Sequence, residues 1–352
     1  MAAGILHSPV FLDHVSSGYH PERPERLPAI IRGLEASGTW RSAQHIPPRD
    51  ALEAELERVH EPSYVERTLR ALGTGRSGDL DSDTFYSAGS RTAALQAAGG
   101  GIDLACAVHR RDVDWGWAVV RPPGHHADRN SAAGFCIFNN IAVAVASLIA
   151  DGHARRVAIF DWDVHHGNGT QDQFWNDPDV LFVSVHQWPH YPGTGLVDEV
   201  GGPDARGRCV NFPFPGGAVD GDYLSVIDLV FAPLVRAFQP DHLCISAGFD
   251  AHVRDPLGGM RLTTGGFGAM AARLQALSRE LCDGRLTLFL EGGYDLQALS
   301  EAAESVSGVL DGTRQAPAAS EQTTRGGAAV TAAVASAIAP FWPGIPLAYS
   351  GA

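Results

Sequence analysis

The chain has 352 residues, of which 45% are hydrophobic and 19% charged, and its formal net charge at pH 7 is -14. This composition is typical of a folded globular protein with a large core. The excess of acidic residues argues against DNA or RNA as a direct partner, because nucleic-acid binding needs a basic surface. The longest apolar stretch, 141–150, is too short to cross a bilayer, so no membrane partner is expected.

The cysteines and the N-terminus indicate the compartment. The five cysteines are odd in number and irregular in spacing, and no two of them form a CxxC pair, which favours free thiols in a reducing environment. The N-terminus lacks the charged and apolar regions of a secretion signal. We therefore expect a cytoplasmic protein.

Short apolar runs alternate along the chain with longer segments of helical periodicity. Unbroken apolar runs are typical of strands that are buried on both faces of a parallel sheet. The predicted strands are 117–120, 157–160, 181–185, 242–246 and 286–290, and the predicted helices are 139–150, 220–235 with a kink at Pro233, 264–282 and 295–310. This alternation predicts an α/β fold with a doubly wound parallel sheet.

The composition changes near the C-terminus. Residues 311–327 are rich in Ala, Gly, Thr and Gln, which predicts a flexible linker. Residues 328–341 predict one more helix, and the residues after it an irregular tail. We expect one domain over 1–311, with 312–352 as a linker, helix and tail packed on it.

Each predicted strand runs directly into a polar cluster at its C-terminal end. In chain order the clusters read RPPGHH, DWDVHH, SVHQ, SAGFDAH and EGGYD. Ligands of open α/β sheets bind outside the carboxyl ends of the strands. The sequence therefore predicts that all five clusters meet at one crevice.

The first cluster presents two adjacent histidines, His125 and His126, after a Pro-Pro-Gly turn. They could ligate a metal, or they could serve as an acid and a base, since imidazole titrates near neutral pH. Histidines of an ordinary surface loop are the plainer interpretation of this motif alone.

The second cluster contains a metal-ligand pair. In an extended strand Asp161, Asp163 and His165 would project to the same side. Asp163 and His165 would be two ligands of a zinc site, and Asp250, at the end of another strand, is the natural third. Three protein ligands leave positions open for water and substrate, as in catalytic zinc sites. A lone Asp-x-His could be a capped strand end. Asp161 has no evident metal role and could instead orient a histidine through its far ring nitrogen.

The last cluster is Glu291-Gly292-Gly293-Tyr294. Its two glycines would let the chain turn sharply at the strand end and present Tyr294. A phenol there can donate a hydrogen bond to a developing oxyanion. For an isolated Gly-Gly-Tyr, a tyrosine that merely packs is the simpler interpretation.

Together these motifs resemble the histone-deacetylase family, which includes acetylpolyamine amidohydrolases and acetoin-utilisation proteins. The resemblance runs from His7 to about Asp311, and the sequences of its motifs are similar to those of class II enzymes and their bacterial relatives. The matching segments are HPERPERL, DSDTFYSAGS, RPPGHHA, AGFCIFNN, DWDVHHGNGTQ, YPGTG, SAGFDAH and EGGYDL. The resemblance implies the arginase-deacetylase fold, a parallel sheet flanked by helices, with 1–311 as the catalytic domain.

The resemblance also implies a role for each matching residue. The implied zinc ligands are Asp163, His165 and Asp250. The implied catalytic residues are His125 paired with Asp161, His126 facing Asn168 as base and then acid, and Tyr294 as oxyanion donor. The implied substrate tunnel is lined by Gly134, Phe135, Tyr191 and Leu257, and Arg26 would lie near an exit path for acetate. The implied potassium site uses backbone carbonyls of Asp161, Asp163, His165 and Val185, the Asp161 carboxylate and the Ser184 hydroxyl.

The implied activity is zinc-dependent hydrolysis of an acyl group from an amine nitrogen, with acyl-lysine or a similar acylated amine as substrate. Leu257 stands where the polyamine-specific enzyme carries an acidic gatekeeper, and Ala88 stands where many relatives have proline. We therefore rank acyl-lysine above acetylpolyamine, which is the alternative substrate. A carboxylate from another loop, such as Asp81 or Asp83, or from a dimer partner could also reach the rim and would favour the polyamine. The sequence leaves four alternatives open: which acylated amine is the physiological substrate, how long its acyl group is, whether the metal is zinc or iron, and whether the chain forms a homo-oligomer.

Two other function classes agree less well with the residues. A catalytically inactive acyl-lysine-binding module would have lost a metal ligand or the tyrosine, and neither is lost here. An arginase-like two-manganese hydrolase would need Asp-x-His-x-Asp spacing, whereas His166 and Asn168 follow His165 in this chain.

Overall fold

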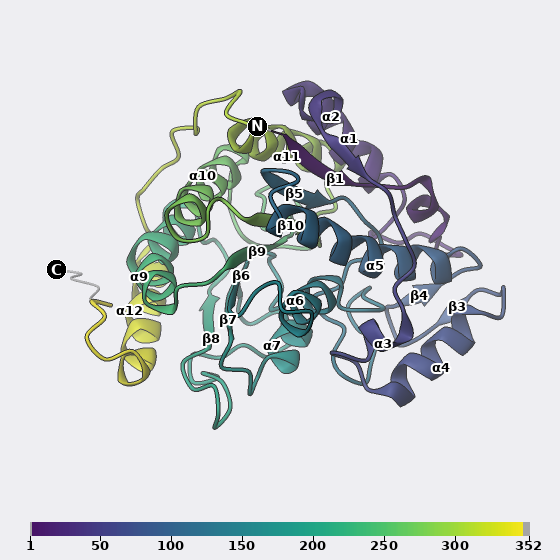
Figure 1. The fold of residues 1–352 in the computed structure, drawn as a ribbon. Helices are drawn as coiled ribbons and strands as arrows, with labels where there is room; N and C mark the ends of the chain where they lie inside the picture. Colours follow the sequence, from purple (N-terminus) through teal and green to yellow (C-terminus); the bar gives the residue numbers. More distant parts are fainter. Residues whose placement is uncertain (1, 348–352) are drawn as a thin grey trace.

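Eight parallel strands form the central sheet of the computed structural model, which describes residues 2–347 (Figure 1). In sheet order the strands are β2 (Gln44–Ile46), β1 (Ala3–Leu6), β5 (Trp115–Ala118), β10 (Leu286–Leu290), β9 (His242–Ala247), β6 (Val157–Asp161), β7 (Val180–Gln187) and β8 (Cys209–Phe214). A separate antiparallel pair consists of β3 (Gly78–Asp79) and β4 (Phe85–Tyr86). Every residue of the five strands β1, β5, β6, β9 and β10 is buried, which is why their sequences are apolar runs.

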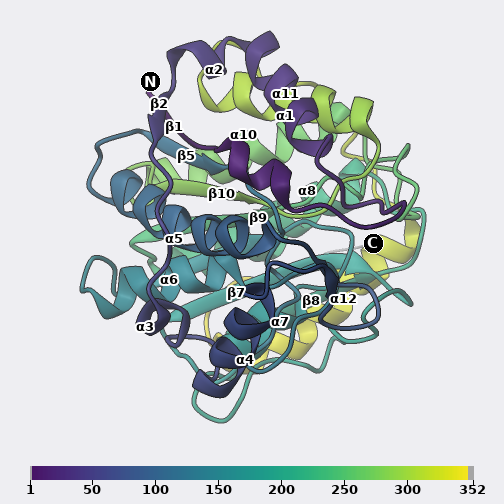
Figure 2. The same ribbon diagram turned by 90° about the vertical axis from the view of Figure 1, so that its right-hand side faces the viewer.

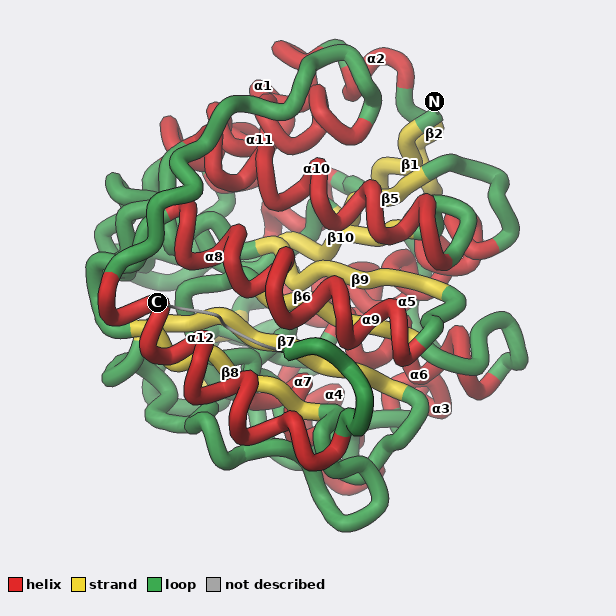
Figure 3. Tube along the Cα trace, turned by 90° about the vertical axis from the view of Figure 1, so that its left-hand side faces the viewer, coloured by secondary structure: helices red, strands yellow, loops and turns green. Residues whose placement is uncertain are grey.

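Helices cover both faces of the sheet. One face carries α5 (Ser90–His109), α6 (Asn140–Ala150) and α7 (Asn168–Gln173) (Figure 2). The opposite face carries α1 (Arg26–Ser37), α8 (Asp220–Val226), α9 (Ala232–Phe238), α10 (Thr264–Leu281), α11 (Leu296–Leu310) and α12 (Arg325–Ile338) (Figure 3). Shorter or peripheral helices are η1 (Pro9–Asp13), α2 (Thr39–Ser42), α3 (Glu53–Leu56), α4 (Pro62–Leu72) and η3 (Ala339–Phe341). Of the helices described, none combines the length and the apolarity that crossing a membrane requires.

The predicted α/β fold with a parallel sheet is confirmed, and the five predicted strands correspond to β5, β6, β7, β9 and β10. The prediction for β5 was two residues too late, because Trp115 already pairs with Ala3 of β1. The strands β1, β2 and β8 were not predicted. β1 and β2 are too short to show a pattern, and β8 contains Pro213, which usually argues against a strand. β8 tolerates this proline because it lies at the edge of the sheet.

The predicted helices are present with different internal detail. Asn139 caps α6 as predicted, its side chain accepting the Ala142 N–H at 3.0 Å. The helix predicted over 220–235 is divided into α8, a π-helical segment η2 (Ile227–Phe231) and α9. The change occurs directly before Pro233, which lacks the N–H that would continue the α-helical pattern.

The C-terminal helix starts earlier than predicted. α12 begins at Arg325 because Thr324 caps it, accepting the Gly327 N–H at 2.9 Å. α12 then lies along the edge strand β8 (Figure 3). The indole of Trp342 donates to the Gly207 carbonyl at 2.9 Å and ties the chain beyond α12 to the same edge. The end of the predicted tail, 348–352, lies outside the described residues.

Candidate metal and catalytic site

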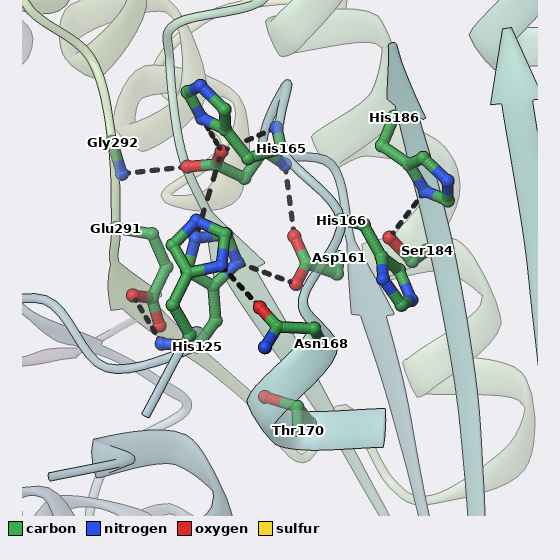
Figure 4. Close-up of polar contacts among 12 residues, drawn as sticks. His125, Asp161, His165, His166, Asn168, Thr170, Ser184, His186, Glu291 and Gly292 are labelled. Carbon is green, nitrogen blue, oxygen red and sulfur yellow. Dashed lines mark hydrogen bonds and ion pairs between the residues drawn. The ribbon is translucent and has the colours of Figure 1, made fainter. Parts of the chain in front are cut away.

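The polar clusters that follow β5, β6, β9 and β10 meet around one cavity of about 220 Å³ at the carboxyl edge of the sheet. The cluster of residues 184–187 was wrongly expected there, because it lies within β7 and only the residues beyond the strand, His190 and Tyr191, reach the cavity. Ser184 and His186 lie behind the cavity instead, next to Asp161 and His166 (Figure 4). All five cysteines are buried and free, so no disulfide shapes the site.

The metal-ligand cluster consists of Asp163, His165 and Asp250. One ligand atom from each residue lies within 4.8 Å of the others. The His165 Nδ1 is 3.1 Å from an oxygen of Asp163 and 3.1 Å from an oxygen of Asp250. The remaining carboxylate oxygens are occupied by backbone donors, since Gly292 N–H binds Asp163 Oδ2 at 2.8 Å and Val164 N–H binds Asp250 Oδ1 at 2.9 Å. One imidazole nitrogen and two carboxylate oxygens therefore lie close together, and both are ligand types that zinc binds in proteins.

The local backbone around these ligands differs from the prediction. β6 ends at Asp161, so Asp163 and His165 lie in a turn and not in an extended strand. The turn forms because the side chains accept nearby N–H groups: Asp161 Oδ1 binds Asp163 N–H at 3.1 Å, and Asp163 Oδ1 binds His165 N–H at 2.9 Å. These bonds bring the side chains of Asp163 and His165 together, whereas the Asp161 side chain pairs with His125.

The two glycines after Glu291 serve different purposes. Only Gly293 has a positive φ, 116°, so only Gly293 provides the turn. A Cβ on Gly292 would lie 2.0 Å from an oxygen of Asp250 and 2.7 Å from one of Asp163. Gly292 thus leaves room beside the metal-ligand cluster. The sharp turn that the sequence predicted for both glycines depends on Gly293 alone.

The side chain of His125 is paired with Asp161. Its Nδ1 donates to Asp161 Oδ2 at 3.0 Å, and both side chains are buried (Figure 4). Burial disfavours the charged imidazole, but the negative charges of Asp163 and Asp161 outweigh burial and raise the pKa of His125 to about 10. The two carboxylates therefore favour the cationic form of His125.

The adjacent His126 has the opposite environment. Its Nδ1 lies 2.7 Å from the side-chain oxygen of Asn168, a neutral acceptor. Burial and then the neighbouring His125 and His165 lower the pKa of His126 well below its usual value. Two neighbouring imidazoles thus have pKa values that are driven apart, an arrangement typical of acid–base sites.

Tyr294 is 8% exposed and lines the cavity. Its ring lies 5.9 Å from the Phe135 ring, edge to face, and the Arg26 guanidinium lies 5.0 Å from its centre. Arg26 itself is buried, donates to the Gly293 carbonyl at 2.7 Å and pairs with Glu22 at 3.1 Å. The residue predicted for an exit path therefore lies directly behind the tyrosine.

The predicted tunnel residues Gly134, Phe135, Tyr191 and Leu257 all line the cavity. Four further lining residues, Asp83, Pro123, His190 and Gly292, were not among the predicted site residues. His190 stacks on His165 at 4.9 Å and its Nε2 lies 2.8 Å from the Leu257 carbonyl, and no motif in the sequence indicated this. Asp83 accepts the Gly134 N–H at 3.2 Å. A larger hollow of about 510 Å³ borders Asn168 from outside but is lined by none of these histidines.

The side chains predicted to bind potassium lie on neighbouring strands. Asp161 of β6 and Ser184 of β7 are direct partners in the sheet. The Ser184 hydroxyl lies 3.0 Å from His186 Nδ1 (Figure 4). The two oxygen-bearing residues are therefore neighbours in register across β6 and β7.

Known proteins resemble the chain over nearly its whole length. Residues 20–310 match the histone deacetylase domain. A probable deacetylase of Archaeoglobus fulgidus is 42% identical over 300 residues, which cover 84% of this chain and 82% of that protein. Histone deacetylase 15 of Arabidopsis thaliana is 40% identical, with 98% of this chain and 62% of the plant protein covered. Histone deacetylase 7 of Homo sapiens is 37% identical, and the match covers 90% of this chain and 37% of the human protein.

A solved structure agrees with the sequence relatives. The crystal structure of the HDA15 HD domain superposes with a TM-score of 0.89 at 38% identity and covers 97% of this chain and 96% of that one. The site geometry, the domain match and the fold all point the same way, and the chain belongs to the histone deacetylase family of hydrolases.

Proposed function

We propose that the chain is a zinc-dependent amidohydrolase that removes an acetyl or other acyl group from an amine nitrogen. The observation that carries this proposal is the convergence of the metal-ligand cluster, the paired histidines and Tyr294 on one cavity. Asp163, His165 and Asp250 would hold the ion. When bound, zinc would polarise the acyl carbonyl and acidify a water molecule.

The chain's own side chains would move the protons. Asn168 accepts from His126 Nδ1, which leaves His126 Nε2 free to take a proton from the attacking water. The neutral amide does not raise the pKa of His126 as a carboxylate would. His126 would then return the proton to the departing amine.

Negative charge on the acyl oxygen would be stabilised by Tyr294 and His125. The Tyr294 hydroxyl would donate a hydrogen bond to this oxygen, and burial keeps the phenol protonated by raising its pKa well above the usual value. The cationic imidazole of His125 would supply a positive charge nearby. Arg26 is proposed to border an exit path for acetate, and Asp161 with Ser184 to bind a structural potassium ion.

The proposed substrate class is acyl-lysine or a similar acylated amine. Leu257 offers an apolar wall to a methylene chain, and a secondary ammonium of a polyamine beside it would lose hydration without gaining a partner. The competing carboxylate, Asp83, lies on the cavity; its Oδ1 accepts hydrogen bonds from Gly134 N–H and the Thr84 hydroxyl, so a polyamine cation would have to reach its Oδ2. We therefore rank acyl-lysine above acetylpolyamine.

The first test is metal content with turnover. The purified protein should contain about one equivalent of zinc, and Asp250→Ala should lose both zinc and activity. Asp220→Asn is the matched control, because Asp220 is a buried carboxylate whose oxygens bind Thr263. It should keep zinc and activity. Full turnover by metal-free Asp250→Ala protein would refute the proposed site, and tight binding of an acyl-lysine peptide without hydrolysis would indicate a binding module.

The second test addresses the substrate class. It compares kcat/KM of the zinc-loaded protein for an acetyl-lysine peptide, longer acyl-lysine peptides, N-acetylputrescine and N8-acetylspermidine. We expect an acyl-lysine peptide to rank first. A clear preference for either polyamine would instead assign the chain to acetylpolyamine hydrolysis.

A further inference from the structure

Asp255 is a buried carboxylate beside the catalytic cavity that the sequence did not single out. It is 7% exposed and lies between the metal-ligand residue Asp250 and the tunnel residue Leu257. Its Oδ2 accepts the backbone N–H of Tyr294 at 2.6 Å and that of Asp295 at 3.2 Å, and its Oδ1 accepts the N–H of Leu257 at 3.0 Å. The Asp255 side chain thus joins the tunnel wall at Leu257 to the loop of residues 291–295 that carries Tyr294, called here the tyrosine loop.

The peptide group that precedes Tyr294 is held at both of its polar atoms. The Gly293 carbonyl accepts from Arg26 at 2.7 Å, while the Tyr294 N–H donates to Asp255 at 2.6 Å. Because a peptide group is planar, fixing its oxygen and its nitrogen fixes its plane. Together with the φ angle of Tyr294, this plane sets the direction in which the Tyr294 side chain leaves the backbone.

The backbone here has little intrinsic preference for this conformation. Gly293 has a φ of 116°, a region open to glycine, and glycine can adopt many other conformations as well. The hydrogen bonds to Arg26 and Asp255 therefore select one arrangement among many. An oxyanion donor displaced by about 1 Å loses much of its effect, since catalytic groups must be held close to their productive geometry.

We infer that Asp255 is a positioning residue for the reaction: by holding the Tyr294 N–H it aims the Tyr294 hydroxyl at the acyl oxygen. This inference rests on the proposed role of Tyr294 in hydrolysis. Asp255 contributes to kcat through the tyrosine, whereas an effect through its bond to the Leu257 N–H on the tunnel wall would persist when the Tyr294 hydroxyl is absent. Removing Tyr294's hydroxyl should therefore remove most of what Asp255 contributes.

The test is a double-mutant cycle on the zinc-loaded enzyme with an acetyl-lysine peptide. Asp255→Asn replaces one carboxylate oxygen by an NH2 group, which donates and cannot accept, so a side chain of the same size can no longer hold the Leu257 N–H and the Tyr294 N–H together. We expect Asp255→Asn to lower kcat at least about tenfold. This loss is smaller than the roughly hundredfold or larger loss that removal of an oxyanion donor causes, because the tyrosine hydroxyl is displaced and not removed. In a Tyr294→Phe background the same substitution should lower kcat less than about twofold. Zinc content should stay at the wild-type value throughout.

Asp220→Asn is again the matched control. Asp220 is 5% exposed and holds the Thr263 N–H at 2.8 Å, at the start of α10 and away from the tyrosine loop. It should lower the melting temperature about as much as Asp255→Asn and leave kcat within about twofold of wild type, since it removes the same kind of hydrogen bond.

Each other outcome is decisive. An equal loss of kcat in both backgrounds, or an equal loss in Asp220→Asn, would overturn the inference. If Asp255→Asn does not fold, Asp255→Ser, which keeps one acceptor, goes through the same cycle, and failure of both to fold would make Asp255 purely structural. If Tyr294→Phe itself turns over normally, the proposed function fails, independently of Asp255.

Discussion

Two buried groups of charged side chains in this molecule are neutralised in different ways. The arginine-balanced cluster consists of Glu22, Arg26 and Arg121, and all three side chains are fully buried. Burial by itself would raise the pKa of Glu22, but Arg121 and Arg26 lower it to about 2. Each guanidinium is paired with the Glu22 carboxylate, and backbone carbonyls accept further N–H groups of both arginines.

The metal-ligand cluster and its neighbour Asp161 are equally buried but less balanced. The ion pairs of Asp161, Asp163 and Asp250 are made with histidines. Burial raises the pKa of Asp161 to about 6 despite the opposing His125, and burial together with Asp163 raises that of Asp250. The arginine-balanced cluster is therefore complete as a structural element, whereas the excess of carboxylates in the metal-ligand cluster favours binding of an added cation.

The largest expected effect comes from breaking the arginine-balanced cluster. Glu22→Gln would leave two buried guanidinium groups without their carboxylate, so the free energy of unfolding should fall by about 3–5 kcal/mol. Urea denaturation measures this loss. The exposed pair of Glu66 and Arg70 provides the control, since Glu66→Gln should change stability by less than about 1 kcal/mol. Equal midpoints for wild type and Glu22→Gln would contradict the stabilising role.

The second effect tests catalysis beside the metal-ligand cluster. Tyr294→Phe should keep the fold and the zinc but lower kcat by on the order of a hundredfold, as for removal of an oxyanion donor. The phenyl ring can still pack under Arg26 and against Phe135. Unchanged turnover would return Tyr294 to a packing role.

A third way of burying an ionisable group is to keep it neutral, and His242 is an example. Burial first, and then His109 and Arg285, lower the pKa of His242 from 6.5 to about 3. The unfolded chain binds a proton below pH 6.5 and the folded chain does not, so stability is lost as the pH falls from 6.5 toward 3. At pH 5 the loss from this one histidine is about 2 kcal/mol.

The matched comparison uses His242→Asn, which cannot titrate. The decrease in unfolding free energy between pH 7 and pH 5 should be smaller in this variant by about 2 kcal/mol. The difference between the two proteins isolates His242 from carboxylates that titrate in the same range. Parallel pH profiles would show that His242 is protonated in the fold.

The smallest expected effect is a change of selectivity at the tunnel. Leu257→Glu should raise kcat/KM for N8-acetylspermidine relative to an acetyl-lysine peptide by about fivefold, since a partly exposed ion pair contributes about 1 kcal/mol. Leu257→Gln is the uncharged control and should leave the ratio near that of wild type. An equal shift in both variants would attribute the change to polarity and not to charge.

Much of the site could be predicted from local sequence. The tandem histidines, the Asp-x-His pair and the Gly-Gly-Tyr turn each occupy a short segment at a strand end, and buried strands are recognisable as apolar runs. Because the strand ends of a parallel sheet share one edge, the predicted strands were enough to place these segments side by side. The edge strand β8 was missed because Pro213 obscured its pattern.

The sequence by itself determined the chemistry that is available at the carboxyl edge of the sheet, together with the class of fold, because both are expressed in local patterns. Only the tertiary structure decided which groups support that chemistry. Glu22 meets Arg121 across 99 positions of the chain, and Asp255 meets Tyr294 across 39. His190 reaches the cavity through its stack on His165. No periodicity or spacing encodes such pairs, because each depends on where the folded chain returns and on which buried polar group needs a partner.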